Sequence, residues 1–183
     1  MKVEATHLEG CYVITPTIFK DSRGSFFESF NQKQFKAQLG VDFNITQTNQ
    51  SVSNKGVLRG LHFQKEPYAQ AKLVRVIKGS VIDVCVDLRK ESKTFGEHFS
   101  VKLTSENNKQ LFVPRGFAHG FITLEDDTIF CYQCDNFYNK ASERGIIYND
   151  SRLNINWHLN ADEFIISEKD LELPNLETIL NQL

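Results

Sequence analysis

Two side chains capable of acid–base and anion-binding chemistry stand three residues apart in the segment GVLRGLHFQ, residues 56–64. They are Arg59 and His62, and the apolar residues around them are typical of a buried strand. Burying a charge without a partner is costly, so the segment either pairs these groups internally or presents them to a ligand. An imidazole ordinarily titrates near pH ~6.5, which suits a general base. His62 is therefore the candidate base.

Three further residues complete an acid–base set. Tyr132 lies in the middle of FCYQC, where a phenol with an ordinary pKa of about 10 can donate a proton from a buried site. Lys72 begins a strand, and its ammonium can stabilise a developing oxyanion. Asp170 in SEKD can orient an imidazole and stabilise its cation. Each of these three and His62 also has a purely structural interpretation: a core tyrosine, a solvated strand end and a first-turn carboxylate favoured by the helix dipole for the three, and a hydrogen-bonded core histidine for His62.

The motif PRGFAH, residues 114–119, matches the PxGxxH pattern of cupin barrels. Cupins usually carry an HxH metal cluster one or two strands earlier, and here His62 is followed by Gln64 instead of a second histidine. Glutamine is a poor ligand for transition metals compared with imidazole or carboxylate. Cys131 and Cys134 form a CxxC, but residues three apart on a strand point to opposite faces. The sequence therefore predicts a cupin barrel without a metal site.

The composition is typical of a globular protein. The chain has 183 residues, of which 40% are hydrophobic and 24% charged, and its formal net charge is −2. No basic face supports nucleic-acid binding, and no run approaches the roughly 18 apolar residues of a membrane span. The N-terminal segment lacks the apolar core of a signal peptide, so we expect a cytoplasmic location and reduced cysteines.

Short strand patterns position the candidate residues. Segments rich in Val, Ile, Phe and Thr predict strands over 11–19, 44–53, 56–63, 72–79, 80–89, 97–103, 109–114, 120–124 and 128–134. Gly79-Ser80 predicts a two-residue hairpin turn. In SVIDVCVDLR one face is wholly apolar and the other carries Asp83, so the second face lies in water or lines a cavity.

Helix signals lie at the margins, over 31–40, 167–173 and 175–183. The whole pattern predicts a mainly β protein, a jelly-roll barrel or sandwich with a few short peripheral helices. We expect one domain over residues 1–183, with a barrel core at about 43–135 and a C-terminal helical segment at about 167–182.

Taken together and in order, several motifs closely resemble the dTDP-4-dehydrorhamnose 3,5-epimerase family. They are DSRGSFFESFN, VLRGLHFQ, KLVRVIKGSVIDVCVDLRKES, VPRGFAHGFITL, and YNDSRLNINW with SEKD. The resemblance covers residues from about 8 to about 172. It implies a cupin-like jelly roll that forms a homodimer and uses no cofactor or metal.

The resemblance further implies an isomerase that epimerises dTDP-4-dehydro-6-deoxy-D-glucose at C3 and C5. The product is dTDP-4-dehydro-L-rhamnose, formed through an enolate in dTDP-L-rhamnose biosynthesis. The alternatives are an epimerase acting at one centre only, C3 or C5, or one acting on the 4-keto-deoxy sugar of another nucleotide. A metal-dependent cupin enzyme is a more distant alternative.

The resemblance also implies roles for individual residues. His62 corresponds to the base, Asp170 to its paired carboxylate, Tyr132 to the acid and Lys72 to a lysine near the 4-keto oxygen. Tyr138 corresponds to an aromatic ring that stacks on the nucleotide base. The other positions that match substrate-binding or site residues are Arg23, Glu28, Gln47, Thr48, Asn49, Arg59, Asp83, His119, Glu143 and Lys169.

Regular strand geometry conflicts with one part of this interpretation. Arg59 and His62 point to opposite faces of a regular strand. Gly60 between them permits a bulge that turns both inward, so we predict that the ladder is broken there. Three departures from the family pattern bear on the choice of substrate: Gln50 in place of His, Tyr148 in place of Trp, and WHLN in place of Trp-Pro. None of them removes a candidate catalytic residue.

Overall fold

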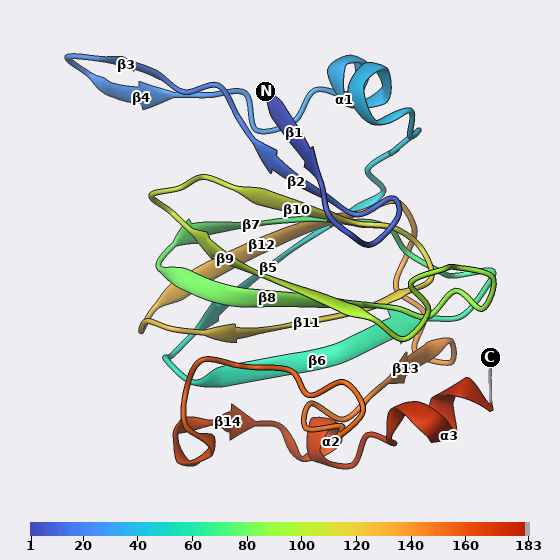
Figure 1. The fold of residues 1–183 in the computed structure, drawn as a ribbon. Coiled ribbons are helices and arrows are strands. Elements are labelled where there is room, and N and C mark those ends of the chain that lie inside the picture. Colours follow the sequence, from blue (N-terminus) through green and yellow to red (C-terminus); the bar gives the residue numbers. More distant parts are fainter. Residues whose placement is uncertain (182–183) are drawn as a thin grey trace.

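Two sheets face each other in the computed structural model, which describes residues 1–181 (Figure 1). The first sheet is antiparallel and follows the order β1 (Lys2–Ala5), β2 (Tyr12–Thr15), β10 (Gln110–Val113), β7 (Lys72–Lys78), β12 (Thr128–Cys134) and β5 (Gln47–Ser53). The second follows the order β13 (Glu143–Gly145), β6 (Val57–Gln64), β11 (Phe117–Thr123), β8 (Ser80–Asp87) and β9 (His98–Thr104). The predicted cupin-type jelly roll is confirmed.

Smaller elements surround this pair of sheets. Strand β14 (Ile165–Ile166) pairs in parallel with β6. Strands β3 (Phe19–Asp21) and β4 (Gly24–Phe26) form a hairpin that projects away from the barrel (Figure 1). The remaining elements are α1 (Gln32–Leu39), the 3-10 turn η1 (Ala161–Glu163), α2 (Glu168–Leu171) and α3 (Leu176–Leu180).

The helices are short and begin at polar caps. The Asn31 side chain accepts a hydrogen bond from the backbone of Gln34 at the start of α1, and Gly40 ends that helix in the left-handed conformation. The predicted helical segments at 167–173 and 175–183 correspond to α2 and α3, but residues 182 and 183 lie outside the described chain. Among the described residues, no helix is both long and apolar enough to cross a membrane.

The predicted hairpin at Gly79-Ser80 is wrong. Strand β7 pairs with β10 and β12, whereas β8 pairs with β9 and β11, so the chain passes here from one sheet to the other. Gly79 has a φ of +81°, and a Cβ at this position would collide with the Thr128 side chain. The sharp turn between the two sheets therefore requires a glycine at position 79. In the sequence, this glycine looks the same as one in a hairpin turn.

The core is layered, and both faces of β8 are buried. Its apolar face, with Ile82 and Val84, packs beneath the C-terminal segment that contributes Trp157 and Leu176. Its other face, with Asp83, points into the space between the sheets and is fully buried. The alternative of a sheet face exposed to water is therefore wrong, and the polar residues of β8 face the barrel interior.

Candidate active site

The ladder between β6 and β11 is interrupted at Gly60, as predicted. His62 pairs with His119 and Arg59 with Phe121, and the register shifts between the two pairs. Gly60 has a φ of +116°, and a Cβ there would lie 2.7 Å from both the Gly120 Cα and the His119 carbonyl oxygen. Only glycine fits such a close approach of two backbones. The irregularity turns Arg59 and His62 toward the same cavity, which both residues line.

His62 is paired with a carboxylate from the C-terminal segment. Pairing of β14 with β6 brings α2 across the bulge, and the Ser167 side chain caps α2 by accepting the Asp170 N–H. The Asp170 Oδ1 atom then lies 2.7 Å from His62 Nε2, and its Oδ2 accepts the Gly60 N–H at 3.2 Å. A carboxylate oxygen at Nε2 favours the tautomer protonated there, which leaves Nδ1 as the basic nitrogen.

The surroundings of Asp170 keep it ionised. Burial alone would raise the pKa of this carboxyl, but the hydrogen bond and electrostatic attraction of His62, together with the Gly60 N–H, outweigh burial and lower it. An ionised Asp170 orients the His62 imidazole and stabilises the positive charge that develops on it when it takes a proton from a substrate.

A second histidine–aspartate pair lies beside the first. His119 Nε2 is 3.0 Å from both carboxylate oxygens of Asp83, and both residues are buried. Burial raises the pKa of Asp83, although the His119 contact and the positive charge of Lys72 oppose that rise. Since His119 lies directly opposite His62 in the β6–β11 ladder, both imidazoles serve the same cavity.

Tyr132 and Lys72 come from the opposing sheet. Tyr132 lies on β12 and Lys72 on the neighbouring β7, and the Lys72 Nζ atom is 5.9 Å from the centre of the Tyr132 ring. Burial raises the pKa of the Tyr132 phenol, so this group is protonated at neutral pH. Burial lowers the pKa of the Lys72 ammonium, although nearby carboxylates of Asp83 and Glu143 oppose the change.

The cavity between the sheets has a volume of about 620 Å³. Many of the residues expected at the site line it: Thr48, Asn49, Arg59, His62, Lys72, His119, Tyr132, Lys169 and Asp170. Arg59 also donates a hydrogen bond to the Ser53 hydroxyl at 3.3 Å, which steadies its guanidinium at the wall. Asp83 is connected to the cavity wall through its contact with His119.

A hydrogen-bonded chain leads from the cavity to the surface. Lys169 Nζ lies 2.6 Å from Glu143 Oε2, which also accepts the Tyr138 hydroxyl at 2.9 Å. Burial would raise the pKa of Glu143, but the bonds from Lys169 and Tyr138 lower it. Gln47 accepts the Tyr138 backbone N–H at 2.9 Å, so its side chain supports the loop that carries this ring.

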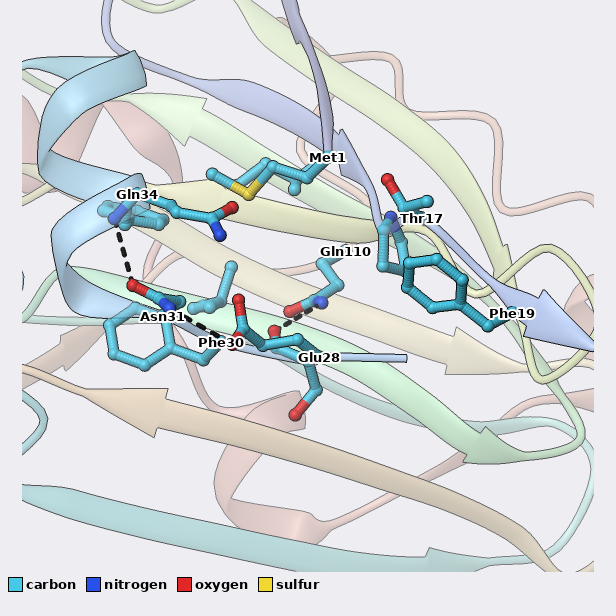
Figure 2. A pocket seen from close by; sticks show the side chains of 13 residues that line it. Met1, Thr17, Phe19, Glu28, Phe30, Asn31, Gln34 and Gln110 are labelled. Atoms are coloured by element: carbon cyan, nitrogen blue, oxygen red, sulfur yellow. Dashed lines mark hydrogen bonds between the residues drawn. The ribbon is translucent and has the colours of Figure 1, made fainter. Parts of the chain in front are cut away.

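Two of the expected residues lie away from the cavity. Arg23 pairs with Asp21 in the projecting hairpin, at 2.6 Å. Glu28 lines a separate cavity of about 200 Å³ next to α1, where it accepts a hydrogen bond from Asn31 (Figure 2). One chain alone therefore does not bring Arg23 and Glu28 to the candidate active site.

Gln64 occupies the position at which cupins carry a second metal-binding histidine. Gln64 directs its amide to the backbones of two loops instead of toward His62. Among residues 1–181, no group of three or more His, Cys, Asp or Glu side chains is placed to hold a metal ion.

Sequence reasoning missed several residues of the cavity wall. Phe121 and Phe130 stack with ring centres 4.1 Å apart and form an apolar part of the wall, and Gln50 and Ser51 line it from β5. One signal was available, because Phe130 stands two residues before Tyr132 on a strand and so shares its face.

What this arrangement can do chemically is move protons on and off a small molecule held between the sheets. An imidazole oriented by a carboxylate can accept a proton on one side, and a buried phenol can donate one from the other. The fold and the site thus define a cupin-type barrel that can catalyse proton transfer by general acid–base chemistry.

Comparison with known proteins identifies the family within this class. A family model described as dTDP-4-dehydrorhamnose 3,5-epimerase matches residues 5–178. The dTDP-4-dehydrorhamnose 3,5-epimerase of Shigella flexneri is 48% identical over 93% of each chain. The crystal structure of the same enzyme from Elizabethkingia anophelis is 49% identical, covers 97% of each chain and superposes with a TM-score of 0.95. A dTDP-6-deoxy-D-glucose-3,5-epimerase from Legionella pneumophila, in complex with dTDP-4-keto-L-rhamnose, is 42% identical with a TM-score of 0.93, over 97% of this chain and 94% of that one. This chain belongs to the dTDP-4-dehydrorhamnose 3,5-epimerase family, whose members are isomerases.

Proposed function

We propose that this chain converts dTDP-4-dehydro-6-deoxy-D-glucose into dTDP-4-dehydro-L-rhamnose by inverting C3 and C5, a step of dTDP-L-rhamnose synthesis. One observation carries the proposal: the Asp170-oriented His62 lies on one sheet and Tyr132 on the opposing sheet, across one cavity. The activity named for the relatives, and the sugar nucleotide bound in the Legionella structure, support the same reaction.

The 4-keto group acidifies the C–H bonds of both flanking carbons. His62 Nδ1 takes a proton from one of them, and the C–H electron pair moves into an enolate whose negative charge rests on O4. The Lys72 ammonium stabilises that oxygen. Tyr132 then donates its phenolic proton to the same carbon from the opposite face, which inverts the centre and restores the ketone. Exchange with solvent returns both groups to their starting states before the second carbon reacts.

Binding energy from the nucleotide positions the sugar for these transfers. Arg59 suits the diphosphate because a guanidinium offers paired donors, and Lys169 adds a second positive charge. Tyr138 stacks on the base, and Gln47 and Glu143 support that ring. Thr48, Asn49, His119 and Asp83 complete the polar wall around the sugar. The reaction needs no cofactor or metal, since organic groups supply both the base and the acid; activity that survives exhaustive chelation tests this point.

A homodimer accounts for the two residues that lie away from the cavity. The projecting β3–β4 hairpin carries Arg23 together with a cross-strand pair of exposed rings, Phe19 and Phe26, which are 63% and 72% exposed. Exposed aromatic rings on a projecting hairpin favour contact with another protein surface. We infer that the hairpin crosses to a second copy of this chain and brings Arg23, with Glu28, to the nucleotide bound there.

Complementation tests this arrangement. Arg23→Ala and His62→Ala chains are mixed under conditions that exchange subunits, and activity is measured at low substrate concentration. In a mixed dimer, one site has its own His62 and the partner copy's intact arginine, so about a quarter of wild-type activity returns. Wild-type protein that sediments as a monomer, or mixtures no more active than the parent variants, would exclude the crossing.

Activity itself is tested with a coupled assay. The substrate is incubated with the protein, a 4-dehydrorhamnose reductase and NADPH, and dTDP-L-rhamnose is measured. Wild-type protein gives this product and His62→Ala does not; equal rates for the two would refute the assignment of the base. Because a charged nucleotide sugar does not cross a bilayer unaided, we place the reaction in the cytoplasm.

A further inference from the structure

Gln64 uses every hydrogen-bonding group of its side chain on the backbones of two loops. Its Nε2 donates to the carbonyl oxygens of Tyr68, at 2.6 Å, and Phe137, at 3.1 Å. Its Oε1 accepts the Asn139 N–H at 2.6 Å. The residue is only 8% exposed, so these bonds form away from bulk water, where an unmade bond costs most.

The second of these loops, residues 135–142, carries Tyr138 between the two points that Gln64 holds. Tyr138 is 52% exposed, so the position of its side chain depends on the backbone of its loop and on the bond from its hydroxyl to Glu143. Gln47, on β5 of the other sheet, accepts the Tyr138 N–H, and Glu143, on β13 next to β6, accepts its hydroxyl. Three successive backbone positions, 137–139, are thus fixed by two glutamines that reach the loop from β5 and β6.

We propose that Gln64 is a positioning residue that holds Tyr138 in place for stacking on the nucleotide base. The inference rests on the proposed function, because it requires a nucleotide at Tyr138. An amide is the group that fits here, since the position demands two donors and one acceptor at once. A glutamate would present a second oxygen to two carbonyls, and a histidine has a single donor when neutral. The position that would bind metal in a cupin with an HxH pair therefore serves nucleotide affinity in this chain.

Gln64→Glu and the uncharged Gln64→Met test this role. The dissociation constant of dTDP is measured by calorimetry, and kcat and KM by the coupled assay. Both variants are expected to bind dTDP about five- to twentyfold more weakly, because the loop must be ordered at the moment of binding. We expect kcat at saturating substrate to stay within threefold of wild type, since the proton-transfer groups are untouched.

Asn107→Asp is the matched control. The Asn107 amide likewise donates to one backbone carbonyl, that of Lys102, and accepts from the backbones of Thr104 and Lys109, but its loop connects β9 and β10. Asn107→Asp also replaces an amide that donates to the backbone with a carboxylate, so we expect it to lower stability. We expect its affinity for dTDP to stay unchanged. A double variant with Tyr138→Ala completes the test: if Gln64 acts through Tyr138, adding Gln64→Met to Tyr138→Ala weakens binding no further.

The outcomes separate this inference from the proposed function. Wild-type protein that neither binds dTDP nor turns over the substrate would overturn both. Active wild-type protein with unchanged dTDP affinity in both folded Gln64 variants would overturn the positioning role alone. So would fully additive losses in the double variant, because additivity means that the two residues act independently.

Discussion

Replacing Asp170 with asparagine probes the histidine–carboxylate pair with almost no change in shape. The carboxylate accepts two N–H groups, His62 Nε2–H at 2.7 Å and Gly60 N–H at 3.2 Å. An asparagine has one carbonyl oxygen and two N–H donors, so it can accept only one of these bonds. If its oxygen faces Gly60, its amide faces His62 and favours the tautomer protonated on Nδ1, which cannot act as the base.

The magnitude follows from the charge that is removed. With roughly 4 Å between the centres of the imidazolium and carboxylate charges and an effective dielectric constant of about 20, the attraction is about 4 kcal/mol. Only part of that charge has developed in the transition state. At about 1.4 kcal/mol per factor of ten, losing half to three quarters of this attraction lowers kcat about 30- to 150-fold, and we expect KM to stay nearly unchanged.

The assay is the reductase-coupled rate at saturating substrate, with Asp150→Asn as the control. Asp150 is also a buried carboxylate of the C-terminal region; it accepts the backbone N–H groups of Leu176, at 2.7 Å, and Arg152, at 2.9 Å, and contacts no histidine. Its variant should lose stability and keep kcat. A kcat for Asp170→Asn within about threefold of wild type, in a folded protein, would refute the reasoning.

Three further predictions concern the bulge, the acid and the stability of the barrel. Gly60→Ala should cost about 2–4 kcal/mol of unfolding free energy in urea titrations, because its φ of +116° and the contact with Gly120 leave no room for a Cβ. Tyr132→Phe should spare solvent exchange of the first proton more than inversion, measured by NMR in D₂O; inversion of both centres at full rate would disprove its role. Asp87→Asn should cost about 2–3 kcal/mol at neutral pH: burial would raise the Asp87 pKa, but bonds from Arg89, Ser92 and Thr94 lower it. A depressed pKa gives stability that is present above the ordinary value near 3.8 and is lost as pH falls through the folded value, so the difference from wild type should narrow in acid, and a constant difference would contradict this origin.

Local patterns were sufficient to predict most of the strands and the reactive side chains. Strand β12 spans 128–134 as its apolar residues predict. Gly60 interrupts the ladder between β6 and β11 where the parity of Arg59 and His62 requires it. The shared cavity of these two residues was predictable because a glycine at a bulge is a local feature.

Features that depend on tertiary partners were not predictable in the same way. The glycine at position 79 marks a sharp turn, but nothing local indicates that the next strand joins the other sheet. Short strands such as β13 and β14 exist because β6 offers them a ladder, so their own sequences carry little signal. The positioning role that we propose for Gln64 depends on its bonds to Phe137 and Asn139, in a loop far along the chain from it.

The placement of Arg23 shows a different limit. The resemblance connects it with the nucleotide, yet in the described chain it lies on a hairpin that projects from the barrel (Figure 1). We propose that Arg23 completes a site in another copy, and its pairing with Asp21 in its own chain does not reveal that role. Sequence motifs identify such a residue, whereas the structure of one chain shows only where it lies in that chain.

The measurement that tests the central claim most directly is proton NMR of dTDP-4-dehydro-6-deoxy-D-glucose incubated with the protein in D₂O without added metal. Our account predicts that deuterium enters at both C3 and C5 and that the product trapped by the reductase is the L-rhamnose nucleotide. Exchange and inversion at one carbon alone would contradict the double epimerisation, and the absence of exchange at both carbons would contradict the assignment of His62 as the base that acts on this sugar.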